Sequence, residues 1–564
     1  MLMKVAAIFM SELKWWQKTT VYQIYPKSFL DTTGSGTGDL AGIASKLDYL
    51  QKLGIGAVWL TPIYSSPMVD NGYDISDYTS IDPSYGTMND FDNLIAEAKL
   101  RNIRIVMDIV YNHSSDQHKW FLESKSGRDN PKADWYIWRD AVDGHAPTNW
   151  RSIFGGSAWT WCEARQQYYL HTFAPQQPDL NWENPAVRRA LYDAARFWLD
   201  KGLGGLRIDA ITYIKKPAEF VDGTPDGSDG MVSVHTMTAN TPGILDFLHE
   251  FKRECFDGRD IFTVGEANGV SASELGNWVG TNGVFDMLFE FSHMLLPFNK
   301  GEEIWCRPRD WKLTELKTAL SNSQKATATD GWYPIFFENH DQPRSINHFF
   351  PRGADPIKAA KAMATVLLTL RGTPFIYQGQ ELGMTNVSWN SIDDYNDISS
   401  HGQYELALKE GFSKEQAMKF VHFFSRDNAR TPMQWSGGAN AGFSTGCPWL
   451  PPHDDYARCN ADDESNDENS VLNYFRTLNE LRQHNEAILY GDYEELFQND
   501  NRIYAFARSA NGSKVVVLVN FTLNDVGIPM EFLNGARLIL GSYTTDFRGT
   551  LRPLEAVIYE EELQ

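Results

Sequence analysis

Acidic side chains stand at the ends of several short apolar runs in this sequence. Asp209 closes the run GLRID, Glu266 closes IFTVGE, and Asp341 ends YPIFFENHD. Cleavage of a glycosidic bond requires one carboxyl that protonates the leaving oxygen and a second carboxylate that attacks the sugar or activates water. A single aspartate at such a position more often caps a helix. Three carboxylates in equivalent positions instead predict hydrolysis of a glycoside, with Asp209 and Glu266 in the two roles.

Arg207 lies two residues before Asp209 on the same run. Alternate residues of a strand point to the same face, so Arg207 is expected to hold Asp209 oriented and ionised. Glu266 would be crowded by Asp209 and Asp341. That crowding predicts a raised pKa for Glu266, which is what a proton donor needs.

The elements that would bring these side chains together form an alternating pattern of short β-type runs and longer amphipathic stretches. Eight such runs predict an α/β protein with a closed (β/α)8 TIM barrel, whose active site lies at the carboxyl ends of its strands. Residues at those ends, including Asp108, His113, Arg207 and His340, should therefore converge. The predicted strands are 21–26, 57–63, 103–111, 205–209, 261–266, 284–291, 333–341 and 373–379.

Three segments exceed what a simple barrel requires. The stretch 114–204 is far longer than a usual strand-to-helix loop. It predicts an inserted subdomain after the third strand, at 114–180, followed by a helix near 185–201. Residues 383–465 are read as a loop-rich extension over the barrel mouth, and 469–484 as a closing helix. The barrel would thus comprise 1–113 and 181–484, with a C-terminal antiparallel β-sandwich at 485–564.

Composition narrows the possible partners. The 564 residues carry a formal net charge of −22, which disfavours nucleic acid and favours a neutral small molecule such as an oligosaccharide. The five cysteines are scattered and form no CxxC motif, so we expect no disulfide framework and a cytoplasmic location. The apolar stretch 1–10 is short and lacks a cleavage pattern, and no run is long enough for a membrane span. The oligomeric state stays open.

Six motifs in a fixed order carry a resemblance to glycoside hydrolase family 13, the α-amylase family, over essentially the whole chain. Within that family the chain is most similar to the small α-glucosidases, because it also contains WWQKTTVYQIYPKSF at 15–29, NGYD at 71–74 and SRDNARTPMQW at 425–435. The six motifs are DIVYNH at 108–113, QPDLN at 177–181, GLRIDAITYI at 205–214, TVGEA at 263–267, ENHDQPR at 338–344 and GTPFIYQGQE at 372–381.

The resemblance implies roles for individual residues. Asp209 would be the nucleophile of a retaining mechanism, Glu266 the general acid and base, and Asp341 a third carboxylate that grips ring hydroxyls. Asp74 would hold the far hydroxyls of the terminal glucose and restrict the enzyme to exo cleavage. The residues implied to bind substrate are Tyr73, Asp74, His113, Phe154, Phe173, Gln177, Arg207, His340 and Arg426.

Many members of the family bind calcium in a loop after the first strand. Here that loop reads DTTGSGTGD at 31–39, with Thr33 and Ser35 at two ligand positions. Only Asp31 and Asp39 remain as carboxylates, too few for a hard cation that takes six to eight oxygens. We therefore predict no bound metal and no cofactor.

The substrate is less well defined by the sequence. Ala210, directly after Asp209, resembles relatives that accept α-1,4 links as well as α-1,6 links. The loop at 31–39 resembles that of trehalose-6-phosphate hydrolases, which keeps a phosphorylated substrate open. The segment 422–427 differs from that of sucrose isomerases, and a non-catalytic binding protein is disfavoured by the intact carboxylates. Basic residues that could meet a phosphate are Lys215, Lys216, Arg307 and Arg309.

Overall fold

The computed structural model describes residues 13–299, 304, 306–529, 533, 535–545, 547 and 549–562. The predicted absence of a signal peptide at 1–10 concerns residues outside these ranges. Eight strands form one sheet in the order β13-β12-β10-β5-β2-β1-β15-β14, and all their pairings are parallel. The strands are β1 (Val21–Ile24), β2 (Ala57–Leu60), β5 (Arg104–Val110), β10 (Gly205–Asp209), β12 (Phe262–Glu266), β13 (Met287–Phe289), β14 (Pro334–Ile335) and β15 (Thr373–Tyr377).

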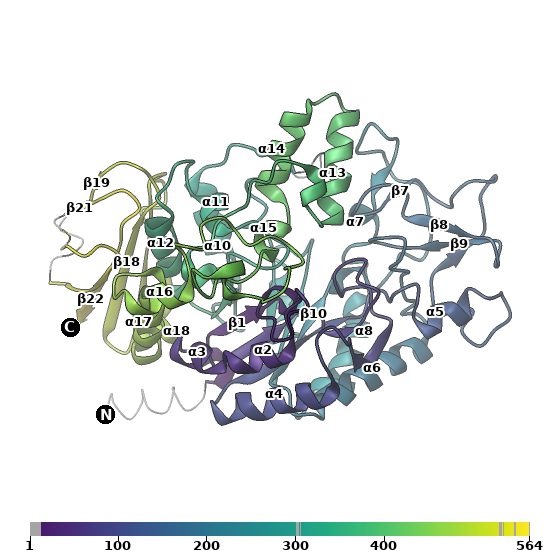
Figure 1. Ribbon diagram of the computed structural model, residues 1–564, viewed down its shortest axis with the longest axis horizontal. Coiled ribbons are helices and arrows are strands. Elements are labelled where there is room, and N and C mark those ends of the chain that lie inside the picture. The colour runs from purple at the N-terminus through teal and green to yellow at the C-terminus, as the bar shows by residue number, and fades with distance from the viewer. Residues whose placement is uncertain are drawn as a thin grey trace.

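Helices follow the strands and surround the sheet (Figure 1), and contacts between β13 and β14 close it into a barrel. The predicted (β/α)8 barrel is confirmed, although β14 ends six residues before Asp341, so His340 and Asp341 lie on the loop beyond it. The surrounding helices are α2 (Leu40–Ser45), α3 (Leu47–Lys52), α4 (Met88–Leu100), α6 (Pro185–Leu199), α8 (Ile244–Phe251), α9 (Leu275–Trp278), α10 (Leu313–Ala326), α12 (Pro356–Thr369) and α17 (Val471–His484).

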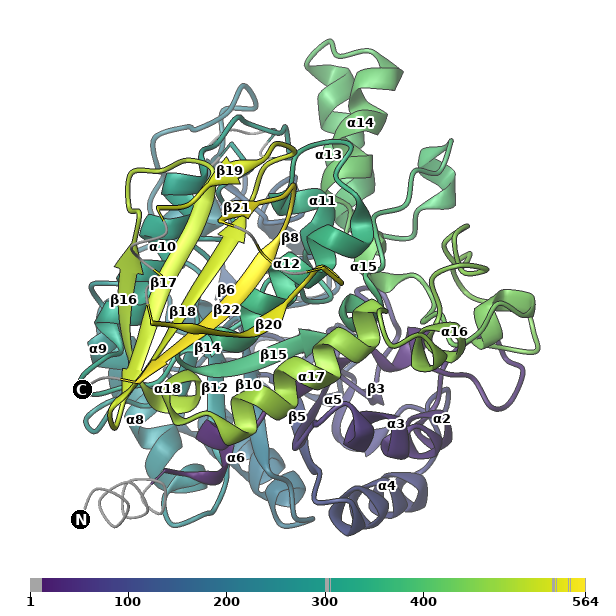
Figure 2. The ribbon, with the colours of Figure 1, turned by 90° about the vertical axis from the view of Figure 1, so that its left-hand side faces the viewer.

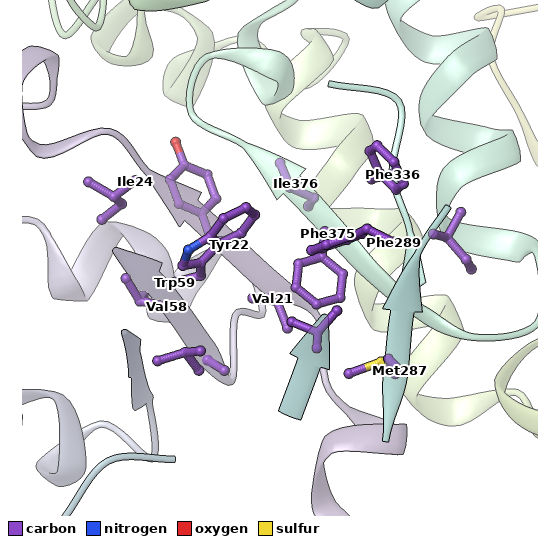
Figure 3. Close-up of a cluster of buried hydrophobic side chains, with 14 of the residues drawn as sticks. Val21, Tyr22, Ile24, Val58, Trp59, Met287, Phe289, Phe336, Phe375 and Ile376 are labelled. Carbon is purple, nitrogen blue, oxygen red and sulfur yellow. The ribbon is translucent and has the colours of Figure 1, made fainter. Parts of the chain in front are cut away.

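Aromatic and aliphatic side chains from the barrel strands pack in one buried cluster (Figure 3). The ring of Phe289 lies 4.9 Å from both Phe336 and Phe375, and 5.7 Å from Trp59. Such side chains bury large apolar areas in tilted and edge-to-face pairs. Trp59 also donates a hydrogen bond to Asp108 (3.3 Å), so this packed layer supports the polar groups that lie above it.

The segment after β5 forms a small separate unit. It contains α5 (Lys119–Ser124), β7 (Trp150–Arg151) and an antiparallel sheet of β6 (Trp138–Arg139), β9 (Gln167–Leu170) and β8 (Trp159–Cys162). Its apolar core also takes in Val232 and Val234, because β11 (Val232–Ser233) pairs with β7. The bounds 114–180 stay a prediction. The structure shows that Val232 and Val234, from the loop after β10, also belong to this unit.

The stretch 383–465 is more helical than predicted. It contains α13 (Ile398–Lys409) and α14 (Lys414–Phe424), which project from the barrel next to each other (Figures 1 and 2), and the short helices α15 (Asp427–Arg430) and α16 (Ala461–Asn466). A loop-rich interpretation of 398–424 is therefore wrong. Ser413 and Gln416 form a capping box that starts α14, and the apolar side of this helix packs in a cluster of its own through Val421 and Phe424.

An antiparallel sheet follows the barrel, as predicted (Figure 2). Its order is β16 (Asp492–Leu496), β17 (Ile503–Ala510), β18 (Ser513–Asn520), β22 (Ala556–Glu562) and β20 (Arg537–Gly541), with the short pair β19 (Val526–Gly527) and β21 (Thr550–Leu551) beside it. Alternate residues of β18 point to opposite faces. Val515 and Val517 join the main core, whereas Val516 and Leu518 form a second cluster. Both faces of this sheet are therefore buried.

No helix in the described ranges is both long and apolar enough to cross a bilayer. All five cysteines are free thiols.

Candidate active site

Arg207 is the centre of the candidate site. Its guanidinium contacts Asp108 (2.8 and 3.0 Å), Asp209 (2.7 Å) and Glu266 (2.8 Å), and its side chain is only 2% exposed. These side chains come from the adjacent strands β5, β10 and β12, whose parallel register sets Arg207 opposite Asp108. One planar guanidinium thus holds both carboxyls proposed for bond cleavage, as the same-face argument predicts for Arg207 and Asp209.

The backbone after β10 turns sharply at Ala210. This residue has φ of 45° and ψ of 34°, the left-handed region that a residue with a Cβ enters at a cost. The turn aims the N–H of Ala210 at Oε2 of Glu266 (2.9 Å), the oxygen that also faces Arg207. Within the described part of the chain, the hydrogen bonds of these two carboxyls involve Oε2 of Glu266 and Oδ1 of Asp209. Each carboxyl therefore has one anchored oxygen and one available for substrate.

The electrostatics of Asp209 reflect both its burial and its neighbours. Burial raises the pKa of Asp209 well above its ordinary value, Arg207 opposes this shift, and the charges of Glu266 and Asp108 add to it. Arg207 thus favours the ionised carboxyl of Asp209, as predicted, but burial has the larger effect on its pKa. A positive charge developing on a sugar above it would favour the anion, so that stabilisation would be greatest in an oxocarbenium-like state.

Asp341 is connected to the Arg207 cluster through His340. The Nε2 of His340 lies 3.0 Å from Asp341 and 2.6 Å from the hydroxyl of Tyr73, whose ring stacks on the imidazole. The amide of Gln23 lies 2.8 Å from Nδ1 of His340, and Tyr73 also contacts Asp108 (2.9 Å). A chain of hydrogen bonds therefore joins the Asp341 side of the site to the Arg207 side.

Two arginines surround Asp341. Arg430 donates to its Oδ1 at 2.7 Å, and Arg426 lies 3.3 Å from the same oxygen. Burial opposes ionisation of Asp341, but His340, Arg426 and Arg430 outweigh it and hold its pKa well below the ordinary value. Asp341 is therefore a fixed anion with a 31% exposed side chain that a ligand can reach. Arg430 was not among the predicted site residues, although it lies in the SRDNARTPMQW motif.

Asp70, which was not among the predicted site residues, lies beside two of the predicted binding residues, Arg426 and Gln177. Its carboxylate lies 3.2 Å from Arg426 and 3.2 Å from the amide of Gln177. Asp74 is instead fully buried and accepts hydrogen bonds from Ser66 and from the backbone N–H groups of Val69 and Asp70, each at 3.0 Å. The predicted substrate contact of Asp74 is corrected accordingly, because its oxygens are already used to order its own loop. Burial raises the pKa of Asp74 to about 6.

The remaining predicted binding residues lie on one side of this cluster. Gln177 contacts His113 (3.2 Å), and the rings of His113 and Phe173 meet at 5.2 Å. Phe154 lies 5.7 Å from Phe173, and the guanidinium of Arg426 lies over the Phe154 ring at 5.1 Å. Phe154 and Phe173 are half-buried. The structure therefore brings all the predicted substrate residues together except Asp74.

The basic residues considered for a phosphate are mostly occupied. Lys215 pairs with Glu183 (2.6 Å) and Arg309 with Glu315 (2.6 Å). Lys216 is buried rather than on the surface, with its ammonium 2.8 Å from Asp179 and 3.0 Å from Oδ1 of Asn112. Lys216 therefore joins the QPDLN and DIVYNH motifs to each other, next to His113.

The loop at 31–39 is held by its own donors. Both oxygens of Asp31 accept hydrogen bonds, one from the backbone of Thr33 and Gly34 and the other from Gly36 and Ser444. Asp39 caps α2 through Gly42. These contacts use the oxygens that a cation would need.

A barrel with paired carboxylates at its strand ends, a guanidinium between them and a third ionised carboxylate nearby defines a glycoside-cleaving enzyme. The family described as the catalytic domain of alpha-amylase matches residues 23–491, and the chain belongs to it. The protein is a glycoside hydrolase, and the resemblance predicted from the motifs is confirmed.

Full-length relatives refine this assignment. The oligo-1,6-glucosidase of Parageobacillus thermoglucosidasius is 42% identical over 562 residues, covering 98% of this chain and 100% of the relative. The trehalose-6-phosphate hydrolase of Bacillus subtilis (strain 168) is 42% identical over 556 residues, covering 97% and 98%. The crystal structure of an isomaltulose synthase from Protaminobacter rubrum superimposes with a TM-score of 0.92 at 40% identity, covering 97% and 99%.

Proposed function

We propose that the protein is a retaining, exo-acting α-glucosidase that releases terminal α-1,4- or α-1,6-linked glucose from short oligosaccharides. The observation that carries this proposal is the shared contact of Asp209 and Glu266 with the guanidinium of Arg207, which holds two carboxyls close together at the barrel mouth. Retaining enzymes need the two carboxyls about 5–5.5 Å apart, so that one can attack while the other donates a proton.

In the first step, Oδ2 of Asp209 attacks the anomeric carbon while Glu266 protonates the leaving oxygen, which gives a β-linked glucosyl-enzyme and the released aglycone. In the second step Glu266 takes a proton from water, whose oxygen displaces Asp209, and the product is α-glucose. Asp341 remains ionised and would hold ring hydroxyls of the distorted sugar.

Exo cleavage would depend on Asp70 rather than Asp74. Asp70 and Arg426 bridge the loop at 66–74 and the segment after α14. We propose that this ion pair closes the pocket beyond the terminal glucose, which leaves no path for a longer chain.

The alternative with specific support is hydrolysis of trehalose 6-phosphate, which the name of one relative suggests. The ion pairs of Lys215, Lys216 and Arg309 reduce the number of cations available to a phosphate. A sucrose-active glucosidase or isomerase is a further alternative, suggested by the isomaltulose synthase. The five free thiols support a cytoplasmic location.

The test is a panel of maltose, isomaltose, sucrose, trehalose and trehalose 6-phosphate, with the first anomer followed by NMR. Turnover of maltose and isomaltose, with α-glucose as the first product from p-nitrophenyl α-glucoside, supports the proposal, whereas β-glucose as the first product from that glucoside, or turnover of trehalose 6-phosphate alone, contradicts it. Azide gives a sharper test of the roles. With Asp209→Ala it should yield β-glucosyl azide, and with Glu266→Ala α-glucosyl azide, because the first forms by one inversion and the second by two.

A further inference from the structure

Asp397 is a fully buried carboxylate in the loop that precedes α13. Its Oδ1 accepts from two nitrogens of Arg426, Nε at 2.8 Å and Nη2 at 2.7 Å, and from the N–H of Ser399 at 3.1 Å. Its Oδ2 accepts from the hydroxyl of Ser400 at 2.7 Å. The carboxylate thus caps α13 and at the same time holds one edge of the Arg426 guanidinium.

The opposite side of the same guanidinium faces the candidate site. Nη1 of Arg426 lies 3.3 Å from Asp341, and Nη2 lies 3.2 Å from Asp70. These two contacts are longer than the contacts with Asp397. Short charge-assisted hydrogen bonds fix the orientation of a planar guanidinium. The geometry therefore makes Asp397 the stronger anchor, and the contacts with Asp70 and Asp341 follow from where it sets Arg426.

The helix that Asp397 caps also lies against the rim of the site. A Cβ added to Gly402 in α13 would come 3.0 Å from the carbonyl oxygen of Phe154, so the helix packs closely on the backbone there. The ring of Phe154 lies beneath the Arg426 guanidinium. The helix therefore meets the rim at two points, through Asp397 and through Gly402.

We propose that Asp397 is a positioning residue for the glucosidase reaction, which acts through Arg426 to set the glucose-binding side of the pocket and ties that side to α13. It touches neither the proposed nucleophile nor the proposed acid. The inference rests on the proposed function, and it assigns to the projecting helix α13 a part in binding the terminal glucose.

Asp397→Asn separates the two roles of this side chain. Asparagine caps a helix as well as aspartate does, so α13 should keep its start. The neutral amide loses the charge that holds Arg426 and sets an NH2 group against its donors. We expect the KM for p-nitrophenyl α-glucoside and the Ki for glucose to rise together by about 10- to 100-fold, the range of a charge-assisted hydrogen bond. The kcat/KM values for maltose and isomaltose should fall by the same factor, because the substitution affects the part of the pocket that binds the terminal glucose, which both substrates share.

A matched control is Asp355→Asn. Asp355 caps α12 in the same way, through the N–H groups of Ile357 and Lys358, but it is exposed and away from the site. This variant should keep the wild-type KM and Ki. A merely structural role for Asp397 would lower kcat through a smaller active fraction and leave KM and Ki unchanged, and that result would overturn the inference.

A double-mutant cycle with Arg426→Lys tests whether Asp397 acts through Arg426. A lysine at 426 cannot present the fork, so adding Asp397→Asn to it should cost little more. Additive losses would contradict the inference. If Asp397→Asn fails to fold, Asp397→Glu, which keeps the charge but displaces Arg426, should raise KM and Ki in the same way, and unchanged values would contradict the inference. These variants can be interpreted only if the wild-type protein cleaves α-glucosides. A wild type inactive on all of them refutes the proposed function, whereas an active wild type with normal KM and Ki in Asp397→Asn refutes only the role of Asp397.

Discussion

The guanidinium of Arg207 offers the most direct test of the electrostatics proposed for the site. Arg207→Lys keeps a positive charge but replaces a planar fork with a single ammonium, which cannot contact three carboxylates at the distances observed. The wild-type contacts with Asp108, Asp209 and Glu266 are all 2.7–3.0 Å. If lysine keeps one contact and loses two, at about 1.5–3 kcal/mol each, the loss is about 3–6 kcal/mol. We therefore expect kcat/KM for p-nitrophenyl α-glucoside to fall about 10²- to 10⁴-fold.

The pH profile separates charge from geometry. Arg207 lowers the pKa of Asp209 against the upward shift from burial, so its removal raises that pKa further. The nucleophile must be ionised, and a higher pKa moves the acid limb of kcat/KM to higher pH. The limb should therefore move further in Arg207→Gln, which removes the charge, than in Arg207→Lys.

Both profiles are to be measured with the melting temperature of each variant, because removing a buried cation leaves its carboxylates unpaired. An acid limb that stays at its wild-type position in a folded Arg207→Gln enzyme would refute the electrostatic role. It would leave Arg207 as a residue that only orients its neighbours.

Three further outcomes are expected. EDTA should leave the melting temperature unchanged, because the oxygens of Asp31 are already hydrogen-bonded, and a large drop would contradict this reading of the loop. Ala210→Val should shift the kcat/KM ratio roughly tenfold towards isomaltose and lower the melting temperature, since a β-branched residue is disfavoured more strongly than alanine at the left-handed φ of this position; an unchanged ratio would exclude residue 210 as a determinant of linkage. Asp70→Asn should reduce kcat/KM by about 10- to 100-fold, whereas Asp74→Asn should chiefly lower the melting temperature. A large loss of kcat/KM in Asp74→Asn with little change in Asp70→Asn would instead support Asp74 as the binding residue.

The barrel and the residues on its strands could be predicted because both depend on short-range regularities. The alternation of apolar runs and helices predicts the fold, and the two-residue period of a strand sets Arg207 beside Asp209. Helices in the excess sequence were harder to predict. The stretch 398–424 carries a capping box at Ser413, which indicates a helix start. The Gly, Pro and Asp clusters further along indicate loops, and they mask this signal when the segment 383–465 is taken as a whole.

Loop geometry explains why the sequence alone does not distinguish Asp70 from Asp74. Both lie within a few residues of Tyr73, and no period relates positions in a loop to a common face. Which carboxylate turns to the site depends on which one the loop itself satisfies. Three donors converge on the fully buried carboxylate of Asp74, whereas, among the described residues, the carboxylate of Asp70 contacts the side chains of Arg426 and Gln177.

The proposed closure of the pocket depends on residues that lie far apart in the sequence. Asp70 and Arg426 are 356 residues apart, and the orientation of Arg426 depends in turn on Asp397 at the start of α13. In the proposed mechanism the ends of β10 and β12 supply the two groups for bond cleavage, Asp209 and Glu266. We propose that the loop at 66–74, through Asp70, and the segment 397–426, through Asp397 and Arg426, set the binding of the terminal glucose. Selection of a terminal unit should therefore change with substitutions in these two segments while the Arg207 cluster, and with it the retaining chemistry, stays as it is.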